Sequence, residues 1–190
     1  MKKKSKLFII SGPAGVGQGT IIKKLLEIPE LNLQWVKGYT TRAQRESDQK
    51  EQKYNFVSIE EFKALEKNGE IFESTFYNNN FYGTSKSEIN KVLKLGHNAI
   101  RDVDPIDGQK NFRHIFPNSV LIFITANLYD IKNRLINRGQ NTAEEIDERT
   151  KFAKKQIEYA KLFDYIVENP EGHPEKAVEE IERIIQKEIA

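Results

Sequence analysis

The sequence predicts an α/β fold in which a mostly parallel β-sheet carries helices on both faces. A short apolar run at residues 6–10 leads into a glycine-rich loop and then into a segment with apolar residues at helical spacing. Three later apolar runs, at residues 99–103, 120–125 and 165–167, have the length of buried strands, and helical patterns separate them. With 190 residues, the chain is long enough for one compact domain with small inserted lobes.

The composition excludes several classes of protein. With 38% apolar and 31% charged residues, the chain is too apolar for general disorder and too polar for a membrane protein. The absence of cysteine rules out disulfides, cysteine-bound zinc and thiol catalysis. A net charge of +2 does not indicate a nucleic-acid partner, and no apolar run approaches the roughly 20 residues that span a bilayer. Because Gly12-Pro13 ends the first apolar run too early for a secretion signal, a cytoplasmic protein is expected.

Local signals mark where helices begin. The capping box Ser/Thr-x-x-Glu, in which two side chains satisfy free amides of the first turn, predicts three helix starts. They stand at Ser58 with Glu61, Ser85 with Glu88, and Thr142 with Glu145. The third opens a long helix whose apolar or small residues at 146, 150, 153, 157 and 160 form one packing face. Pro174 stands near the start of the last helix.

The texture of the sequence divides the chain further. Residues 34–96 are rich in Tyr, Asn, Thr, Gln and charge, with few purely apolar runs, which predicts a polar lobe inserted into the α/β core. Residues 133–154 are polar and in part basic, which predicts a helical lid. The core is then expected to consist of residues 1–33, 97–132 and 155–190.

The glycine-rich loop follows the phosphate-binding pattern G-x-x-x-x-G-K-[S/T] at all constrained positions but one. Glycines let the backbone approach a phosphate closely, its amides form a nest, and the helix N-terminus adds partial positive charge. A hydroxyl at Thr20 would reach a Mg²⁺ ion. We therefore expect the phosphates of a nucleotide to bind to the loop formed by Gly12, Pro13, Ala14, Gly15, Val16, Gly17, Gln18, Gly19 and Thr20, and the resemblance described below implies that this nucleotide is ATP.

The departure from the pattern is Gln18, which stands where the loop lysine would be. Lysine would place a full charge on the phosphates during transfer, whereas glutamine has similar reach and a hydrogen-bond donor but no charge. Losing one preorganised electrostatic contact commonly costs about 10²–10³ in rate. Three outcomes stay open at this point: catalysis is weakened, another cation covers the gap, or the chain no longer performs the chemistry.

Further segments, in order along nearly the whole chain, make the sequence resemble guanylate kinases. The loop itself is similar to that family's GPSGVGKGT or GPSGVGKST. The other matching segments are residues 39–45 with S-x-TTR-x-x-R, 54–58 with Y-x-F-V-S, Glu73 with the Glu of F-I-E, 81–84 with YYGT, 102–104 with D-I-D, 116–124 with FPxxxxIFI, 134–139 with RL-x-x-RG and 163–165 with FDY. So many ordered matches are far more specific than the loop alone.

The resemblance implies a role for each matching residue. It implies that the GMP phosphate is bound by Arg42, Arg45, Tyr54 and Tyr82, and the guanine base by Glu73 and Thr84 with support from Asp104. It implies that Thr20 and Asp102 lie near Mg²⁺ bound with ATP, and that Arg134, Arg138 and Arg149 act in catalysis, with Gln18 at the lysine position. Taken singly, these residue types also fit ordinary roles: Arg149 as a solvated helix charge, Tyr54 and Tyr82 as packing, Asp102 and Asp104 as turn residues.

Several positions depart from the family pattern besides Gln18. Gly38 stands where the family has a serine that touches the GMP phosphate, and Arg101 stands where an apolar residue is usual. Ser47 and Glu51 occupy positions that are usually glycine, and the 105–108 segment is one residue longer. The GMP site is thus mostly kept, while the donor-phosphate site has lost its main charge.

The resemblance therefore implies a guanylate kinase that converts ATP and GMP to ADP and GDP, with activity reduced by Gln18. A catalytically silent binding protein of the same fold, a protein that binds GMP without turnover, and an engineered lysine-to-glutamine change remain as alternatives. The expected partners are small nucleotides, with no nucleic acid and no membrane, and both monomer and homodimer stay open.

Overall fold

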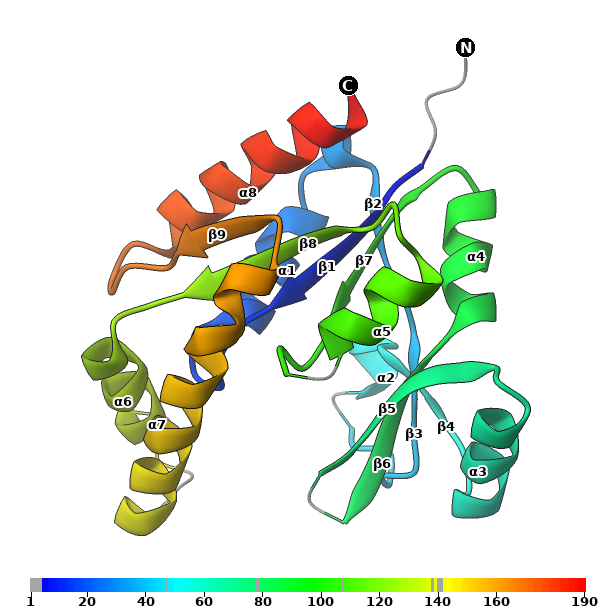
Figure 1. The fold of residues 1–190 in the computed structure, drawn as a ribbon, viewed down its shortest axis with the longest axis horizontal. Helices are drawn as coiled ribbons and strands as arrows, with labels where there is room; N and C mark the ends of the chain where they lie inside the picture. The colour runs from blue at the N-terminus through cyan, green and yellow to red at the C-terminus, as the bar shows by residue number, and fades with distance from the viewer. Residues whose placement is uncertain (1–4, 47, 78, 107, 138, 140–141) are drawn as a thin grey trace.

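The computed structural model describes residues 5–46, 48–77, 79–106, 108–137, 139 and 142–190. Within these residues the strands form two sheets (Figure 1). The larger has five strands, and every pairing in it is parallel. In spatial order they are β2 (Leu33–Trp35), β7 (Asn98–Asp102), β1 (Leu7–Ser11), β8 (Val120–Thr125) and β9 (Tyr165–Glu168). The predicted strands therefore form, within a residue or two of their expected bounds.

Side chains that alternate along the buried strands build a core on each face of the larger sheet. On β1, Phe8 and Ile10 belong to one apolar cluster, and Leu7 and Ile9 belong to the other. Helices α1 (Gln18–Leu26) and α8 (Pro174–Ile189) cover the first face. Helices α4 (Lys86–Lys94) and α5 (Gly108–Ile115) cover the second face. The predicted α/β architecture with helices on both faces is confirmed.

A second, four-stranded mixed sheet projects from the larger one, at the lower right of Figure 1. Its strands, in spatial order, are β4 (Tyr54–Phe56), β3 (Gly38–Thr40), β6 (Asn80–Ser85) and β5 (Ile71–Tyr77). Helix α3 (Ile59–Lys67) packs on it through the fully buried Phe62, which stacks on Phe81 at 5.4 Å between ring centroids. The short helix α2 (Asp48–Glu51) precedes β4. This part of the chain is the predicted inserted lobe.

The structure places the lobe boundaries differently from residues 34–96. Strand β2 pairs with β7 in the larger sheet, and Ile89 and Val92 of α4 pack in the core beneath that sheet. The small sheet therefore occupies only residues 38–85. The composition of the sequence did not indicate these boundaries. Short edge strands and amphipathic helices carry many polar residues even when they belong to the core.

Two helices form an arm at the lower left of Figure 1, opposite the lobe. They are α6 (Leu128–Asn137) and α7 (Ala143–Ile157), and the 3₁₀ helix η2 (Glu158–Leu162) follows α7. A second 3₁₀ helix, η1 (Pro29–Leu31), lies elsewhere and follows α1. The arm extends beyond the predicted lid of residues 133–154 at both ends. Thr142 and Glu145 form a complete capping box at the start of α7, as do Ser58 and Glu61 at α3. At the start of α4, Ser85 accepts from the Glu88 amide at 3.2 Å, which is half of the capping box predicted there.

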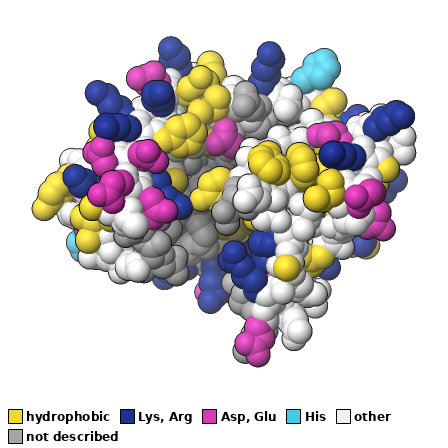
Figure 2. Space-filling model, turned by 90° about the horizontal axis from the view of Figure 1, so that it is seen from below, with side chains coloured by type: hydrophobic (Ala, Val, Ile, Leu, Met, Phe, Trp, Pro, Cys, Tyr) yellow, Lys and Arg dark blue, Asp and Glu magenta, His cyan; other side chains and the backbone are white. Residues whose placement is uncertain are grey.

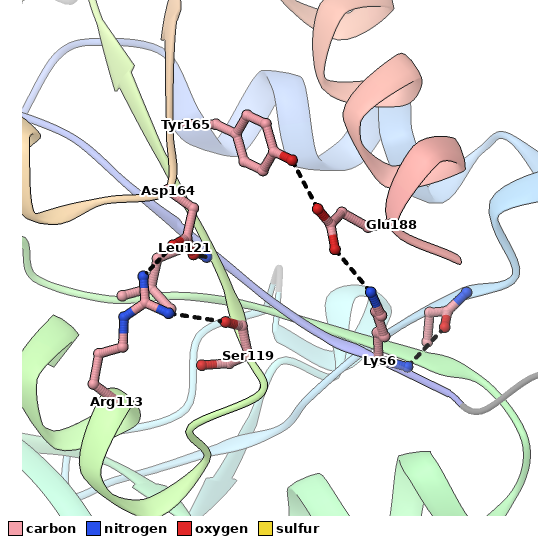
Figure 3. A network of polar contacts seen from close by, with 8 residues as sticks. Lys6, Arg113, Ser119, Leu121, Asp164, Tyr165 and Glu188 are labelled. Atoms are coloured by element: carbon pink, nitrogen blue, oxygen red, sulfur yellow. Dashed lines mark hydrogen bonds and ion pairs between the residues drawn. The ribbon is translucent and has the colours of Figure 1, made fainter. Parts of the chain in front are cut away.

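Polar contacts at the far end of the sheet join the two ends of the described chain (Figure 3). Glu188 of α8 accepts from Lys6 Nζ and from the Tyr165 hydroxyl, each at 2.7 Å. Asp164, within the predicted FDY segment, accepts from the Leu121 amide at 2.8 Å and from Arg113. Asp164 thus connects the start of β9 to β8.

None of the described helices combines the length and apolar character needed to cross a membrane.

Candidate active site

The glycine-rich loop lies between β1 and α1, at the carboxyl edge of the larger sheet. Gly12 has a φ of +155°, and a Cβ placed there would lie 2.3 Å from the carbonyl oxygen of Ile124, so only glycine fits. Gly17, with φ +96°, is the N-cap of α1, and no side chain among the described residues caps this helix. Of the first-turn amides of α1, that of Thr20 donates to Gly17 O at 3.1 Å, whereas those of Gln18 and Gly19 have no side-chain cap and suit an anion.

A ring of side chains holds the outer side of the loop. Arg134 of α6 donates from Nη1 to Val16 O and from Nη2 to Asn169 O, both at 3.0 Å, and its Nε lies 2.6 Å from Glu171 Oε2. Asn169 Nδ2 also donates to Val16 O at 2.7 Å. Arg134 and Thr20 line a cavity of about 350 Å³ beside the loop. In this structure Arg134 is thus bonded to the loop backbone and the β9–α8 turn.

On its inner side, the loop faces the lobe across a second cavity of about 460 Å³. Residues of the loop, β4, β5, β6, β7 and α7 line it, including Gln18, Tyr54, Glu73, Tyr82, Arg101, Asp102, Asp104 and Gln156. The buried Gln18 Nε2 makes no hydrogen bond to any described residue. An unsatisfied donor at this position is costly unless a ligand accepts from it.

Glu73 is the buried carboxylate of this cavity, with 9% of its surface exposed. Its Oε2 accepts from the Thr84 hydroxyl at 3.0 Å, across the β5–β6 ladder. Burial raises the pKa of Glu73 above its ordinary value, and the nearby Arg101 guanidinium opposes part of that rise. The structure thus brings together the two residues that the resemblance assigns to guanine.

A third cavity of about 580 Å³ shares Tyr54 and Asp102 with the second, which Tyr82 also lines. Arg42 and Arg45 both line the third cavity, and Tyr82 meets the Tyr54 ring edge-on at 5.9 Å. Arg42 is held in a bidentate pair with Asp48, at 2.7 and 2.8 Å. Its guanidinium and the Arg45 amide lower the pKa of Asp48 to about 2. The arginines predicted to bind phosphate are thus adjacent, with the charge of Arg42 already partnered.

Gln156 of α7 is a site residue that the sequence analysis missed. It is 4% exposed, its Oε1 accepts from the Ala14 amide at 3.3 Å, and its Nε2 donates to Asp104 Oδ2 at 3.2 Å. It therefore links the loop to the strand end that carries Asp104. The available signal was a polar residue one turn from Ala153 and Ala160, on the inward face of a long helix.

Of the two remaining predicted arginines, the structure describes only Arg149, which lies in the arm. Arg149 of α7 donates to the Tyr77 hydroxyl of β5 at 3.0 Å, which joins the arm to the lobe. Arg138 lies outside the described residues. Figure 2 shows this side of the molecule from below, with basic and acidic side chains interspersed.

The residues predicted near a metal lie on two sides of the loop. Thr20 lines the outer cavity, whereas Asp102, with a side chain 43% exposed, lines the two inner cavities. No cluster of three or more metal-binding side chains occurs in the described part of the chain. A sparse hydroxyl and carboxylate set suits Mg²⁺, which commonly takes one or two protein ligands together with substrate phosphates and water.

Comparison with known proteins identifies related chains. The family model for guanylate kinase matches residues 4–188. Guanylate kinase of Oceanobacillus iheyensis is 35% identical over 189 residues, which cover 99% of this chain and 90% of the relative. Guanylate kinase of Enterococcus faecalis is 36% identical over 189 residues, covering 99% and 91%.

Solved structures share the fold. Guanylate kinase from Anaplasma phagocytophilum aligns with a TM-score of 0.74 and 26% identity, over 100% of this chain and 88% of that one. Shikimate kinase from Bacteroides thetaiotaomicron aligns with a TM-score of 0.51 and 12% identity, over 95% and 98%, a likeness of fold alone.

Proposed function

The chain belongs to the guanylate kinase family, as its motifs predicted, and we propose that it transfers the γ-phosphoryl group of ATP to GMP, giving ADP and GDP. The observation that carries this proposal is Glu73, which accepts a hydrogen bond from the fully buried Thr84 hydroxyl and lines a cavity opposite the glycine-rich loop. A base reader and a phosphate cradle on opposite walls of one cavity suit the positioning of an acceptor nucleotide against a donor.

Glu73 accounts for the choice of base. An ionised carboxylate accepts hydrogen bonds from N1–H and the 2-amino group of guanine, and adenine presents neither donor in that arrangement. Binding adenine would leave the buried Glu73 carboxylate with only the Thr84 hydroxyl as a donor, which a site of this kind rejects strongly. Because burial raises the pKa of Glu73, the neighbouring Arg101 and the Thr84 hydroxyl matter for keeping it ionised.

Arg42, Arg45, Tyr54 and Tyr82 account for the acceptor phosphate. Guanidinium groups bind phosphate through paired N–H donors, and burial raises the pKa of Tyr54, which keeps that phenol a neutral donor. In the structure Arg42 is bonded to Asp48, so a phosphate dianion would have to share or replace that partner. The bound GMP phosphate is therefore coupled to the start of α2.

The loop amides and the N-terminus of α1 account for binding of the donor phosphates. Thr20 and Asp102 would hold Mg²⁺ with ATP, where the ion neutralises phosphate charge. Arg134, Arg149 and Arg138 would supply further positive charge around the transferring group. Gln156 orients the loop relative to Asp104, and the Arg149–Tyr77 contact brings the arm toward the lobe, which limits access of water.

The second candidate is a binding protein that holds GMP without turnover. Gln18 favours it, because its uncharged amide faces the cavity where the loop lysine would act. The two functions share the GMP site and differ only in phosphoryl transfer.

The test combines GMP binding, measured by calorimetry, with formation of ADP in the presence of MgATP and GMP or AMP. We expect GMP-dependent turnover at a reduced rate and a strong preference for GMP. Glu73→Gln should reduce the preference for GMP over AMP, while Glu60→Gln, which changes an exposed glutamate of the same lobe, should leave it unaltered. An unchanged preference in Glu73→Gln would remove Glu73 from the base site, and GMP binding with no turnover would favour the binding protein.

A further inference from the structure

Gly38 and Arg101, two of the positions that depart from the family pattern, lie next to each other in the structure. Gly38 begins β3 of the lobe, and Arg101 lies on β7 of the larger sheet. A Cβ placed on Gly38 would lie 2.4 Å from Arg101 Nη2 and 2.9 Å from its Cζ. The guanidinium therefore fills the space that any side chain at position 38 would need. The two departures from the family pattern therefore lie against each other in the structure.

The Arg101 guanidinium is buried but poorly partnered. The residue is 5% exposed, and its Cζ lies 5.2 Å from the Trp35 ring centroid and 5.6 Å from that of Tyr54. Among the described residues it makes one hydrogen bond, from Nη1 to Val36 O at 3.2 Å. Its buried Nε makes none and lies 3.9 Å from Asp102 Oδ1. Because a guanidinium has five N–H donors and unmet donors are costly in a buried place, the arrangement favours an anionic ligand.

The position of Arg101 also distinguishes it from Arg42. Both guanidinium carbons lie near the Tyr54 ring, at 5.6 and 5.7 Å from its centroid. Arg42, however, is held by both carboxylate oxygens of Asp48. Arg101 has no such bidentate partner among the described residues, and it lines the same cavity as Glu73 and Tyr82. The cation–π contacts with Trp35 and Tyr54 stabilise the guanidinium without using its N–H groups.

We propose that Arg101 is a phosphate-binding residue of the acceptor site, and that its guanidinium donates to the monophosphate of the nucleotide whose base is held by Glu73. Gly38 is the position that makes room for it. This assignment rests on the proposed function, because it takes the acceptor to be a guanine nucleotide. It adds a buried cation to the cavity that Gln18 lines, in a chain whose loop has lost its lysine.

The test compares GMP with guanosine, which presents the same base without a phosphate. Calorimetry on the full chain should show that Arg101→Gln weakens GMP binding by about tenfold to a hundredfold, the usual range for a hydrogen bond between charged groups. Guanosine binding should change by less than about twofold. Arg101→Lys, which keeps the charge but not the fork, should fall between. Arg113→Gln, which removes an arginine paired with Asp164 far from the cavity, should leave both affinities unchanged.

A second variant separates the ligand contact from folding. Gly38→Ala keeps Arg101 in the sequence but forces its guanidinium out of place, since the new Cβ would overlap it. We expect it to weaken GMP more than guanosine, and it carries the test if Arg101→Gln does not fold by circular dichroism.

The possible outcomes separate the inference from the function beneath it. Equal loss of GMP and guanosine would mean that Arg101 acts on the base through Glu73, and unchanged GMP affinity would mean that it has no ligand role; either overturns the inference. Failure of the unaltered chain to bind GMP would overturn the proposed function itself.

Discussion

Replacing Gln18 by lysine tests whether the loop retains the machinery of phosphoryl transfer. The Gln18 Nε2 atom is buried in the cavity shared by the loop and the lobe, with no hydrogen-bond partner among the described residues. A lysine here would carry its ammonium group into the same cavity. The side chain at position 18 therefore already lies where charge would develop in the proposed transfer.

The magnitude follows from the charges around that position. One preorganised electrostatic contact in a water-excluded site is worth about 10²–10³ in rate. The carboxylates of Glu73, Asp102 and Asp104 line the same cavity and would attract the ammonium before reaction, which lowers the net gain. We therefore expect Gln18→Lys to raise kcat with GMP by at least about tenfold. If Arg101 already supplies part of the charge, the increase should stay below the factor of about 10²–10³ given above for one electrostatic contact.

The assay couples ADP formation to oxidation of a nicotinamide reporter, with GMP and MgATP saturating. Gln18→Met is the matched control, because it has similar length but neither a charge nor an amide, and it should give no gain. Binding of GMP should be nearly the same in all three proteins, since the change lies on the donor side. If Gln18→Lys binds both nucleotides and turns over no faster than the unaltered chain, the electrostatic reasoning is refuted. If both are inert while GMP binds, the kinase proposal fails.

Three further predictions concern folding. Gly12→Ala should cost more than about 2 kcal/mol in urea unfolding, because the new Cβ would overlap the Ile124 carbonyl oxygen at 2.3 Å; a loss under about 0.5 kcal/mol would show that the loop relaxes freely. Phe62→Ala should cost about 3–5 kcal/mol by removing a fully buried ring from the lobe, and a smaller loss would mean that the lobe repacks. The depressed pKa of Asp48, about 2 against an ordinary value near 3.9, means that its pair with Arg42 stabilises the fold above about pH 4 and stops doing so as the pH falls toward 2. Asp48→Asn should therefore be less stable than the unaltered chain at pH 7, with a difference that shrinks on acidification; a constant difference from pH 7 to pH 2.5 would contradict it.

Elements whose signals lie within a few neighbouring residues were predictable. The run before the glycine loop, the three later apolar runs and the caps at Ser58 and Thr142 all gave the expected strands or helices. A strand buried on both faces must be apolar throughout, and the amides at a helix start need hydrogen-bond acceptors nearby. Both requirements can therefore be recognised from a few consecutive residues. The lobe boundary was less predictable, because β2 pairs with β7 through its backbone, which leaves no mark on residue type.

The candidate site was predictable in its members but not in their connections. The ordered motifs brought out Glu73 and Thr84, which do meet across two strands. They gave no indication that Arg42 is bonded to Asp48, that Arg134 is bonded to the loop carbonyl of Val16, or that Gln156 links the loop to the lobe side of the sheet. Each of these contacts depends on which rotamer fits after the elements have packed.

By itself, the sequence determined the family, the α/β order of elements, the glycine-rich loop with glutamine at the lysine position, and the residue types that line the candidate site. Only the tertiary structure decided that positions 38 and 101, far apart in the chain, share one volume and that a buried guanidinium stands in it. Local sequence patterns reflect which side chains of a segment avoid water and which side chains satisfy its own backbone amides. Which side chain occupies a space between two sheets is decided by excluded volume, and that appears only when both sheets are in place.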